Sequence, residues 1–130
     1  MHILGIVLAA VAGFILGGAW YSPPLFGHVW ARESGTPETH NPDPKAQIRF
    51  FVILLVLLAL VALVLSQALR WHGEAGALSG LGTGAVGSLL AVAVVGMDTL
   101  FERKRLTLFL INAGYYVVSF CVMGAIVGAL

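Results

Sequence analysis

Four long apolar runs constrain the fold of this chain more than any other feature. They cover residues 3–20, 46–69, 75–97 and 106–129 and contain almost no charged side chain. A helix needs about 20 apolar residues to cross the hydrocarbon core of a bilayer, and each run approaches or exceeds that length. We therefore predict an all-α membrane protein, a bundle of four transmembrane helices that forms one domain over residues 1–130.

The composition agrees with lipid as the solvent of this chain. Of the 130 residues, 59% are hydrophobic and 10% are charged, and the mean hydropathy is +0.96. Soluble domains carry about 25% charged residues, which help to cover the core with polar surface. The net charge of +1 gives no electrostatic reason to expect nucleic acid as a partner, whereas membrane lipids are expected partners.

Residues that commonly carry catalysis or bind metals are sparse and scattered. One cysteine, Cys121, and four separated histidines give no metal-ligand spacing, so we expect neither a metal nor a cofactor. The sequence suggests no Ser-His-Asp or Cys-His arrangement, and no pair of acids lies within an apolar run. We therefore expect that the protein is not an enzyme.

Small residues recur every four positions in the first run, at Gly5, Ala9, Gly13 and Gly17. This spacing places them on one face of a helix, where they allow another helix to approach closely. The alternative is that glycine and alanine are simply frequent in membrane helices. We favour a packing role for Gly13 and Gly17.

The third run repeats this pattern more strongly, and the fourth run ends with it. Gly80, Gly84 and Ser88 are spaced by four, as are Gly124 and Gly128. Because glycine disfavours helix formation by itself, we expect close neighbours to hold the third helix and to place it in the middle of the bundle. The second run, residues 46–69, is poor in small residues, and we expect its helix to be the most exposed to lipid.

The first run ends at Trp20-Tyr21-Ser22-Pro23-Pro24-Leu25-Phe26-Gly27. Two prolines prevent the helix from continuing. Beyond them, apolar residues fall on one face and predict a short helix that lies in the membrane interface. Tryptophan and tyrosine favour the headgroup region. The expected interface anchors are Trp20, Tyr21, Phe26, Trp30 and Trp71.

Helix boundaries are predicted from capping residues and charge. Asp43-Pro44 is a typical helix start, with a capping carboxylate before proline at the first helical position. Arg70 to Glu74 is expected to form a tight connection. Asp98 is expected to end the third helix, followed by a charged loop, so that residues 98–105 connect the last two helices.

The basic residues are distributed unequally between the two sides of the predicted bundle. The side of loops 21–45 and 98–105 holds Arg32, Lys45, Arg49, Arg103, Lys104 and Arg105. The opposite side holds Arg70. Because positively charged loops stay in the cytoplasm, both loops should be cytoplasmic and both termini should lie outside a cytoplasmic (inner) membrane.

Asn112, Tyr115 and Tyr116 share one helical face and form the best intramembrane polar group. Asn112 with one of the tyrosines could supply a helix-to-helix hydrogen bond or line a polar pocket. Asp98 is the nearest ionisable residue; it could face the interface, pair with Arg103 or Arg105, or act in coupling or ligand binding. If a site exists, we expect it where the segment from Trp20 to Gly27 meets the ends of the third and fourth helices, near Asp98.

Three stretches resemble one family. They are Trp20 to Trp30, then Leu100-Phe101-Glu102, and Leu108 to Tyr116 with Met123-Gly124-Ala125-Ile126 beyond. Together they resemble the domain of unknown function (DUF) 1761 family, small bacterial multi-pass membrane proteins. The resemblance implies an integral membrane protein of about four helices. It implies no established activity, so it transfers no catalytic residue.

Two functions remain open from the sequence. In the first, the protein is a structural or interaction module of the membrane, whose glycine faces pack helices within one copy or between copies. In the second, it is a small transporter or channel, with a path lined by the glycine-rich third helix and Asn112. Four helices are too few to enclose a wide pore alone, so the second hypothesis requires a homo-oligomer.

Overall fold

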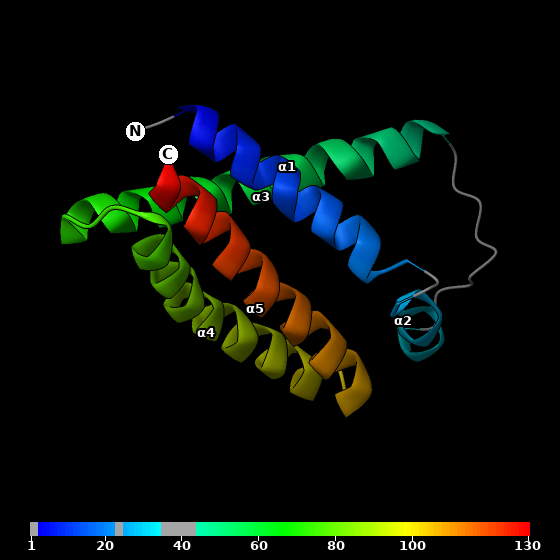
Figure 1. Cartoon of the computed structure of the whole chain (residues 1–130). Helices are drawn as coiled ribbons and strands as arrows, with labels where there is room; N and C mark the ends of the chain where they lie inside the picture. The colour runs from blue at the N-terminus through cyan, green and yellow to red at the C-terminus, as the bar shows by residue number, and fades with distance from the viewer. Residues whose placement is uncertain (1–2, 23–24, 35–43) are drawn as a thin grey trace.

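The computed structural model describes residues 3–22, 25–34 and 44–130. Within these residues the chain forms five helices and no strand (Figure 1). In chain order they are α1 (Ile3–Trp20), α2 (Gly27–Ser34), α3 (Pro44–His72), α4 (Ala77–Phe101) and α5 (Leu106–Ala129). Helices α1, α3, α4 and α5 are each long and apolar enough to cross a membrane, which confirms the predicted all-α class and its four spans. The short helix α2 lies where an interfacial helix was predicted.

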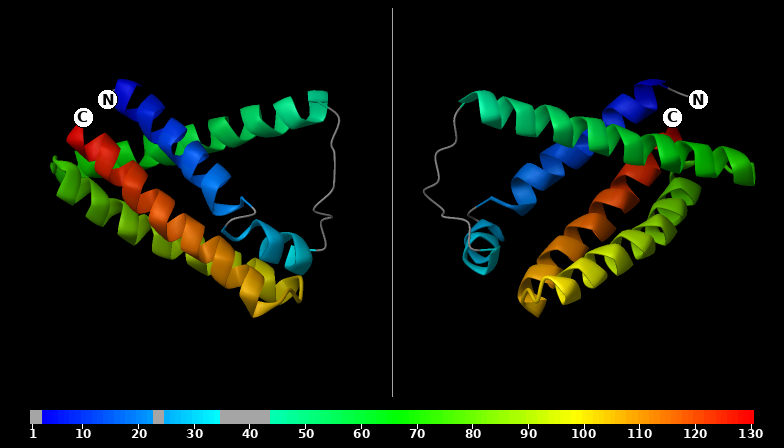
Figure 2. Two further views of the ribbon diagram at one scale, coloured as in Figure 1. Left: turned by 45° about the vertical axis from the view of Figure 1, so that its right-hand side comes forward. Right: turned by 180° about the vertical axis from the view of Figure 1, so that it is seen from behind.

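Helix α5 occupies the middle of the bundle, because it packs against each of the other four helices. It runs antiparallel to α4, and a short turn at one end joins the two (Figures 1 and 2). At the opposite end, the start of α1 meets the end of α5, where a Cβ atom added to Gly5 would lie 3.4 Å from Leu130 Cβ. Helix α2 lies at the same end as the α4–α5 turn (Figure 2).

The prediction that the glycine-rich third helix lies in the middle of the bundle is wrong. Helix α4 packs mainly on α5 alone, and its other faces expose large side chains such as Leu78, Val86 and Leu89. The physical reason is geometric: residues spaced by four lie on one face and can serve only one close neighbour. The glycine pattern correctly indicates a tight contact, but not a central position.

Helices α4 and α5 approach until their backbones touch. A Cβ atom added to Gly80 would collide with the carbonyl group of Gly124, and one added to Gly84 would collide with the carbonyl group of Phe120. At the end of this contact, the N–H of Gly76 donates to the carbonyl oxygen of Gly128 at 2.8 Å. Between membrane helices, such close approach supplies the dispersion contacts that hold a pair together.

On the other side of α5, small and large side chains from three helices interlock. The buried cluster contains Ala9 and Ala10 of α1, Leu58, Ala62 and Leu65 of α3, and Met123 of α5. Gly13 provides room for this cluster, because a Cβ atom at its position would lie 2.9 Å from Met123 Sδ and 3.1 Å from Leu58 Cδ2. The small residues of α1 therefore face both α3 and α5.

Helix α3 crosses α1 and then diverges from α4. The two helices meet at their connecting turn and separate towards the start of α3 (Figure 2). In the most apolar 18 residues of α3, 17% are buried, the same share as in α4, against 28% in α1 and 33% in α5. Helices α3 and α4 are therefore the two most exposed helices, to the same extent, whereas the sequence predicted that α3 alone would be the most exposed to lipid.

Two predicted boundaries are wrong. Helix α3 continues through Arg70 to His72, and the connection is formed by Gly73 to Gly76, which starts and ends with glycines of positive φ (70° and 102°). Asp98 does not end α4, which continues to Phe101. The chain leaves the helical path at Arg103, whose φ of 55° lies in the left-handed region. The N–H of the next residue, Lys104, then donates a hydrogen bond to the carbonyl oxygen of Thr99. Asp43, the predicted cap of α3, lies outside the described residues.

Candidate functional site

A groove of about 660 Å³ lies between α3, α4 and α5. This volume is within the range of roughly 300–1,000 Å³ that is typical of ligand sites. Most of its lining consists of leucine and valine side chains from α3 and α4, and many of these are more than half exposed. The residues that line the groove are Leu54, Leu57, Leu58, Leu60, Val61, Val64, Leu65, Gly87, Leu90, Ala91, Val94, Val95, Asp98, Tyr115, Tyr116, Ser119 and Phe120.

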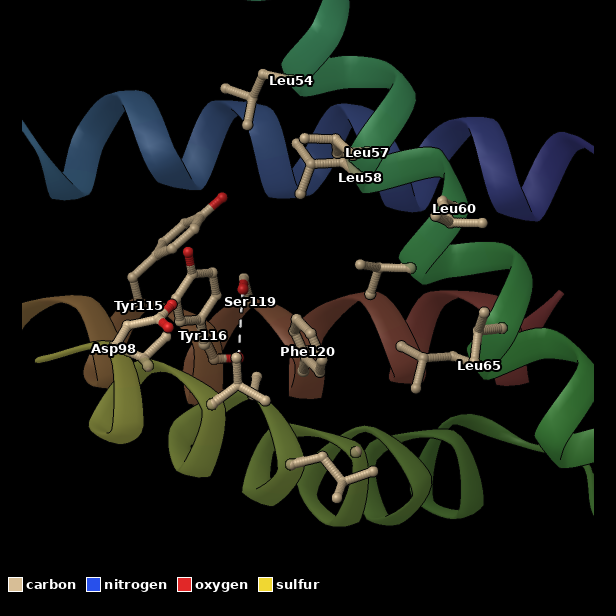
Figure 3. A pocket seen from close by; sticks show the side chains of 17 residues that line it. Leu54, Leu57, Leu58, Leu60, Leu65, Asp98, Tyr115, Tyr116, Ser119 and Phe120 are labelled. Atoms are coloured by element: carbon tan, nitrogen blue, oxygen red, sulfur yellow. Dashed lines mark hydrogen bonds between the residues drawn. The ribbon is translucent and has the colours of Figure 1, made fainter. Parts of the chain in front are cut away.

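The two ends of the groove differ in chemistry. At the narrow end, towards the α3–α4 turn, Gly87 lies close to both walls: its added Cβ would be 3.4 Å from Leu65 Cδ2 and 3.7 Å from Phe120 Cδ2. At the wide end, Figure 3 shows Asp98, Tyr115 and Tyr116 together. The groove is therefore apolar along its length and polar at one end.

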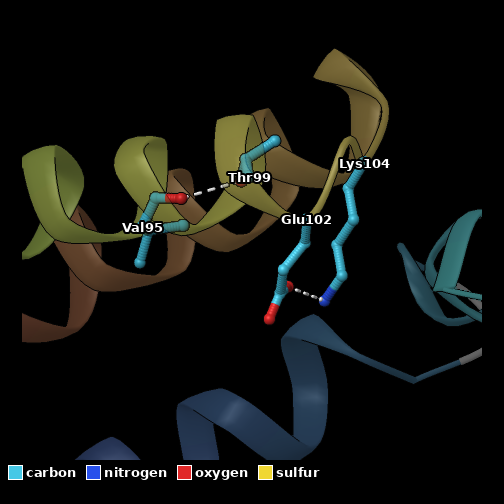
Figure 4. Close-up of polar contacts among 4 residues, drawn as sticks. All are labelled: Val95, Thr99, Glu102 and Lys104. Atoms are coloured by element: carbon cyan, nitrogen blue, oxygen red, sulfur yellow. Dashed lines mark hydrogen bonds and ion pairs between the residues drawn. The ribbon is translucent and has the colours of Figure 1, made fainter.

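Asp98 stands on the last full turn of α4 and is exposed. In the part of the chain that the structure describes, it forms no ion pair with Arg103 or Arg105. The ion pair at this end joins Lys104 Nζ to Glu102 Oε2 at 2.7 Å, while Thr99 donates to the Val95 carbonyl oxygen at 2.7 Å (Figure 4). The Asp98 carboxylate is thus an available hydrogen-bond acceptor at the rim of the groove.

Tyr116 and Ser119 continue the polar end along α5. The Tyr116 ring is half-buried, with its centroid 5.5 Å from the Tyr115 ring and 6.3 Å from the Phe120 ring. Ser119 is buried and donates to the carbonyl oxygen of Tyr116 at 3.3 Å. The hydroxyl of Ser119 is therefore satisfied within its own helix, which leaves Asp98 and Tyr116 as the polar groups that an occupant of the groove can meet.

Asn112 does not line the groove. It belongs to a second polar cluster, the α1–α5 junction, formed by Trp20, Tyr21, Ile111, Asn112 and Tyr115. In this junction the Tyr21 hydroxyl donates to Asn112 Oδ1 at 2.7 Å, and Trp20 Nε1 donates to the Ile111 carbonyl oxygen at 3.0 Å. Asn112 therefore finds its partner on the segment that follows α1, rather than in Tyr115 or Tyr116.

Tyr115 links the junction to the groove. Its ring lines the groove, while its buried hydroxyl donates to the carbonyl oxygen of Gly13 in α1 at 2.9 Å. Two glycines make room for these bridging side chains. A Cβ atom at Gly17 would lie 3.0 Å from the Tyr115 hydroxyl, and one at Gly114 would lie 2.9 Å from Cζ2 of Trp20. Each large side chain thus fits over a glycine of the opposite helix.

The turn after α1 is folded onto this junction by backbone hydrogen bonds and ring contacts. The Phe26 N–H donates to the Trp20 carbonyl oxygen at 3.1 Å, and the two rings lie 4.9 Å apart. The Tyr21 ring lies 5.7 Å from Trp30 of α2 and 5.6 Å from Tyr115. Gly27 is required here, because an added Cβ would lie 2.5 Å from the Tyr21 carbonyl oxygen.

Burial of the Tyr21 side chain, followed by the influence of Tyr116 and Tyr115, raises the pKa of its hydroxyl above the ordinary value. The hydroxyl therefore stays protonated and remains a donor to Asn112. Trp20, Tyr21, Phe26 and Trp30 all have partners within the protein, and their role as interface anchors stays a prediction. Trp71 is different, since 79% of it is exposed.

The structure brings the predicted site residues together only in part. The segment after α1 meets α5 at Ile111 to Tyr115, whereas Asp98 stands on α4 beside the groove; Tyr115 connects the two places. Sequence reasoning missed the groove walls on α3, because nothing in a uniform run of leucine and valine marks which residues face a gap.

Among the described residues, no group of three or more His, Cys, Asp or Glu side chains could hold a metal ion.

Comparison with known proteins gives one finding that bears on identity. A family model described as protein of unknown function (DUF1761) matches residues 4–128, nearly the whole chain. No curated protein matches the chain. No solved structure matches it either. Five of the residues that carry the family resemblance meet in the α1–α5 junction: Trp20, Tyr21, Ile111, Asn112 and Tyr115. The chain belongs to the family of proteins of unknown function described as DUF1761.

Proposed function

We propose that this protein is a non-enzymatic interaction module of the membrane, which holds an apolar partner in the groove between α3 and the α4–α5 pair. The observation that carries the proposal is the groove itself: about 660 Å³, walled by leucine and valine and open between two helices. In a bilayer such a groove is filled by something apolar, because water would leave the apolar walls unfavourably hydrated.

The rest of the fold supports this proposal by holding the groove open. Glycine contacts fix α4 on α5, and the buried hydrogen bond from Tyr115 to Gly13 ties α1 to α5. Helix α3 is packed on α1 and α5 through Leu58, Ala62 and Leu65, in the cluster around Met123. These three contacts hold the walls on both sides of the groove.

The alternative is an oligomeric transporter or channel, with a path lined by the glycine-rich helix α4 and Asn112. Gly80 and Gly84 face α5, and Asn112 accepts a hydrogen bond from Tyr21. No specific observation favours a path through these residues, so we retain the interaction module. The expected result of a liposome flux assay is no transport above empty vesicles, for the parent and for Asn112→Ala alike.

The proposal is tested by filling the groove. Ala91 lines it, whereas Ala93 is exposed on another face of the same helix, so Ala91→Trp and Ala93→Trp form a matched pair. Native mass spectrometry of the purified protein should show a retained apolar ligand in the parent and in Ala93→Trp, and its loss in Ala91→Trp. An intact parent that retains no ligand, or equal retention in both variants, would show that the groove is not a binding site.

A further inference from the structure

We infer that the groove binds one membrane phospholipid with an ammonium headgroup, an aminophospholipid, whose acyl chain lies along α4 and whose ammonium group is held at Asp98. This inference rests on the proposed function and names its partner. Three properties of the groove lead to it: its length, its narrowing shape and the charges at its wide end.

The length of the groove matches one leaflet. Along α4 the lining residues run from Gly87 to Asp98, a rise of about 16 Å at roughly 1.5 Å per residue. The hydrocarbon layer of one leaflet is about 15 Å thick, half of a core of roughly 30 Å. The polar end lies next to the charged turn that follows Phe101, where headgroups are expected. The apolar end, at Gly87, lies near the middle of the 25-residue helix α4, the part expected at the bilayer centre. A single lipid chain has this length and this polarity.

The shape of the groove argues against a transmembrane helix as the occupant. A helix with its side chains is about 10–12 Å across along its whole length. A helix of a second copy would need an apolar surface of that width across both leaflets, whereas the groove narrows at Gly87, where Leu65 and Phe120 approach. A flexible acyl chain fits this narrowing shape.

The charges at the wide end select the headgroup. The Asp98 carboxylate accepts hydrogen bonds and favours a cation that can donate them, and a primary ammonium group does so. The segment from Asp98 to Arg105 nevertheless contains two acids and three bases, so its net charge is +1. A simple lipophilic cation would be repelled by this surplus. A zwitterionic lipid satisfies both signs, because its phosphate is attracted by the basic turn and its ammonium group by Asp98.

Tyr116 completes the recognition of the headgroup. Its half-buried ring stands between the Tyr115 and Phe120 rings on the groove wall, and Figure 3 shows it beside Asp98. An aromatic face beside a carboxylate attracts an ammonium group further, since ring and carboxylate both stabilise positive charge. Phosphatidylethanolamine has the primary ammonium group that this site favours, whereas phosphatidylcholine lacks N–H donors and phosphatidylglycerol lacks the cation.

The test compares these three lipids with matched acyl chains. The delipidated protein is titrated with each lipid in mixed micelles, and bound lipid is counted by native mass spectrometry. The parent should prefer phosphatidylethanolamine over phosphatidylcholine by about tenfold, the effect of one charge-assisted hydrogen bond. Asp98→Asn should lose this preference, and Asp98→Glu should retain it. Glu74→Gln removes an exposed carboxylate at the opposite end of the bundle and should retain the preference.

Failures of the two proposals give different results. Equal binding of all three lipids to the parent, lost in Ala91→Trp, would keep the groove as a binding site and overturn the headgroup assignment. A preference for phosphatidylethanolamine that survives in Asp98→Asn would overturn the role of Asp98. A dimer that Ala91→Trp disrupts would show that a second copy, not a lipid, fills the groove. Absence of any bound lipid in an intact parent would overturn the proposed function as well.

Discussion

The two contacts of α4 are built in opposite ways. Towards α5 it presents Gly80 and Gly84, and the helices approach until backbone meets backbone. Towards α3 it presents larger side chains such as Leu90 and Val94, and the two helices diverge around the groove. Lipid tails are as apolar as leucine, so leucine gives membrane helices no reason to leave lipid for one another. Small residues favour association of membrane helices, because only they allow the backbones to come close.

The largest effect is expected from a substitution that disrupts the close contact between α4 and α5. Gly80→Leu places a side chain where the Gly124 carbonyl group lies, which forces α4 away from α5. We expect a loss of about 3 kcal/mol in the free energy of unfolding in detergent. Gly82→Leu is the matched control, because nothing lies within 4 Å of a Cβ atom at Gly82. Equal destabilisation by both would show that glycine content, rather than the α4–α5 contact, determines stability.

A smaller effect is expected at the hydrogen bond that crosses from α5 to α1. Tyr115→Phe removes the buried hydroxyl that donates to the Gly13 carbonyl oxygen and leaves the ring in place. The expected loss is about 1 kcal/mol, since the carbonyl keeps its helical partner. Tyr116→Phe, on the next position of the same helix, should stay within about 0.5 kcal/mol of the parent. Reversible unfolding in mixed micelles measures both; the opposite order would contradict the assignment of the two tyrosines.

The junction after α1 should give a smaller but coupled effect. Tyr21→Phe and Asn112→Ala each remove one partner of the 2.7 Å hydrogen bond. A double-mutant cycle should yield a coupling energy of about 0.6 kcal/mol, the average for such bonds in membrane proteins. Thermal unfolding of the four proteins gives this value. Additive effects, with no coupling, would mean that the bond adds nothing to the link between the turn and α5.

The smallest effect is expected for a residue that lines the groove between α3 and α4. Leu57 lines the groove and is 53% exposed, whereas its neighbour Leu58 is 6% exposed in the core around Met123. Leu57→Ala should change the free energy of unfolding by less than about 0.5 kcal/mol. Leu58→Ala should cost about 2 kcal/mol, because it leaves a cavity. Comparable losses at both positions, measured in the same micelles, would show that α3 packs against α4 after all.

Much of the fold could be predicted from the sequence, because length and polarity alone determine which segments can cross a membrane. The glycine spacing also indicated the faces of close contact. The arrangement of the helices could not be predicted, since Gly80 and Gly84 show that a neighbour is close but not which helix it is. The end of α4 was misplaced because Asp98 is compatible with a last helical turn, and the stop depends on the left-handed backbone at Arg103.

The candidate site was predictable only at its polar end. Asp98, Tyr115 and Tyr116 stand out in an apolar chain, and the structure places them together at one end of the groove. The partner of Asn112 was not predictable, because Tyr21 is 91 positions away in the sequence. The leucine walls of α3 carry no signal either, since every face of that helix has the same composition.

The most direct test of the divergence between α3 and α4 is carbene footprinting of the unmodified protein in liposomes, with a diazirine carried on a lipid tail. The reagent labels side chains that touch lipid, and mass spectrometry locates the label. We expect groove residues such as Leu57, Leu90 and Val94 to be labelled as strongly as outward-facing Val86, with Ser88 and Met123 protected. Protection of Leu57, Leu90 and Val94 to the level of Met123 would show that α3 and α4 close on each other in a membrane, and would contradict the open groove.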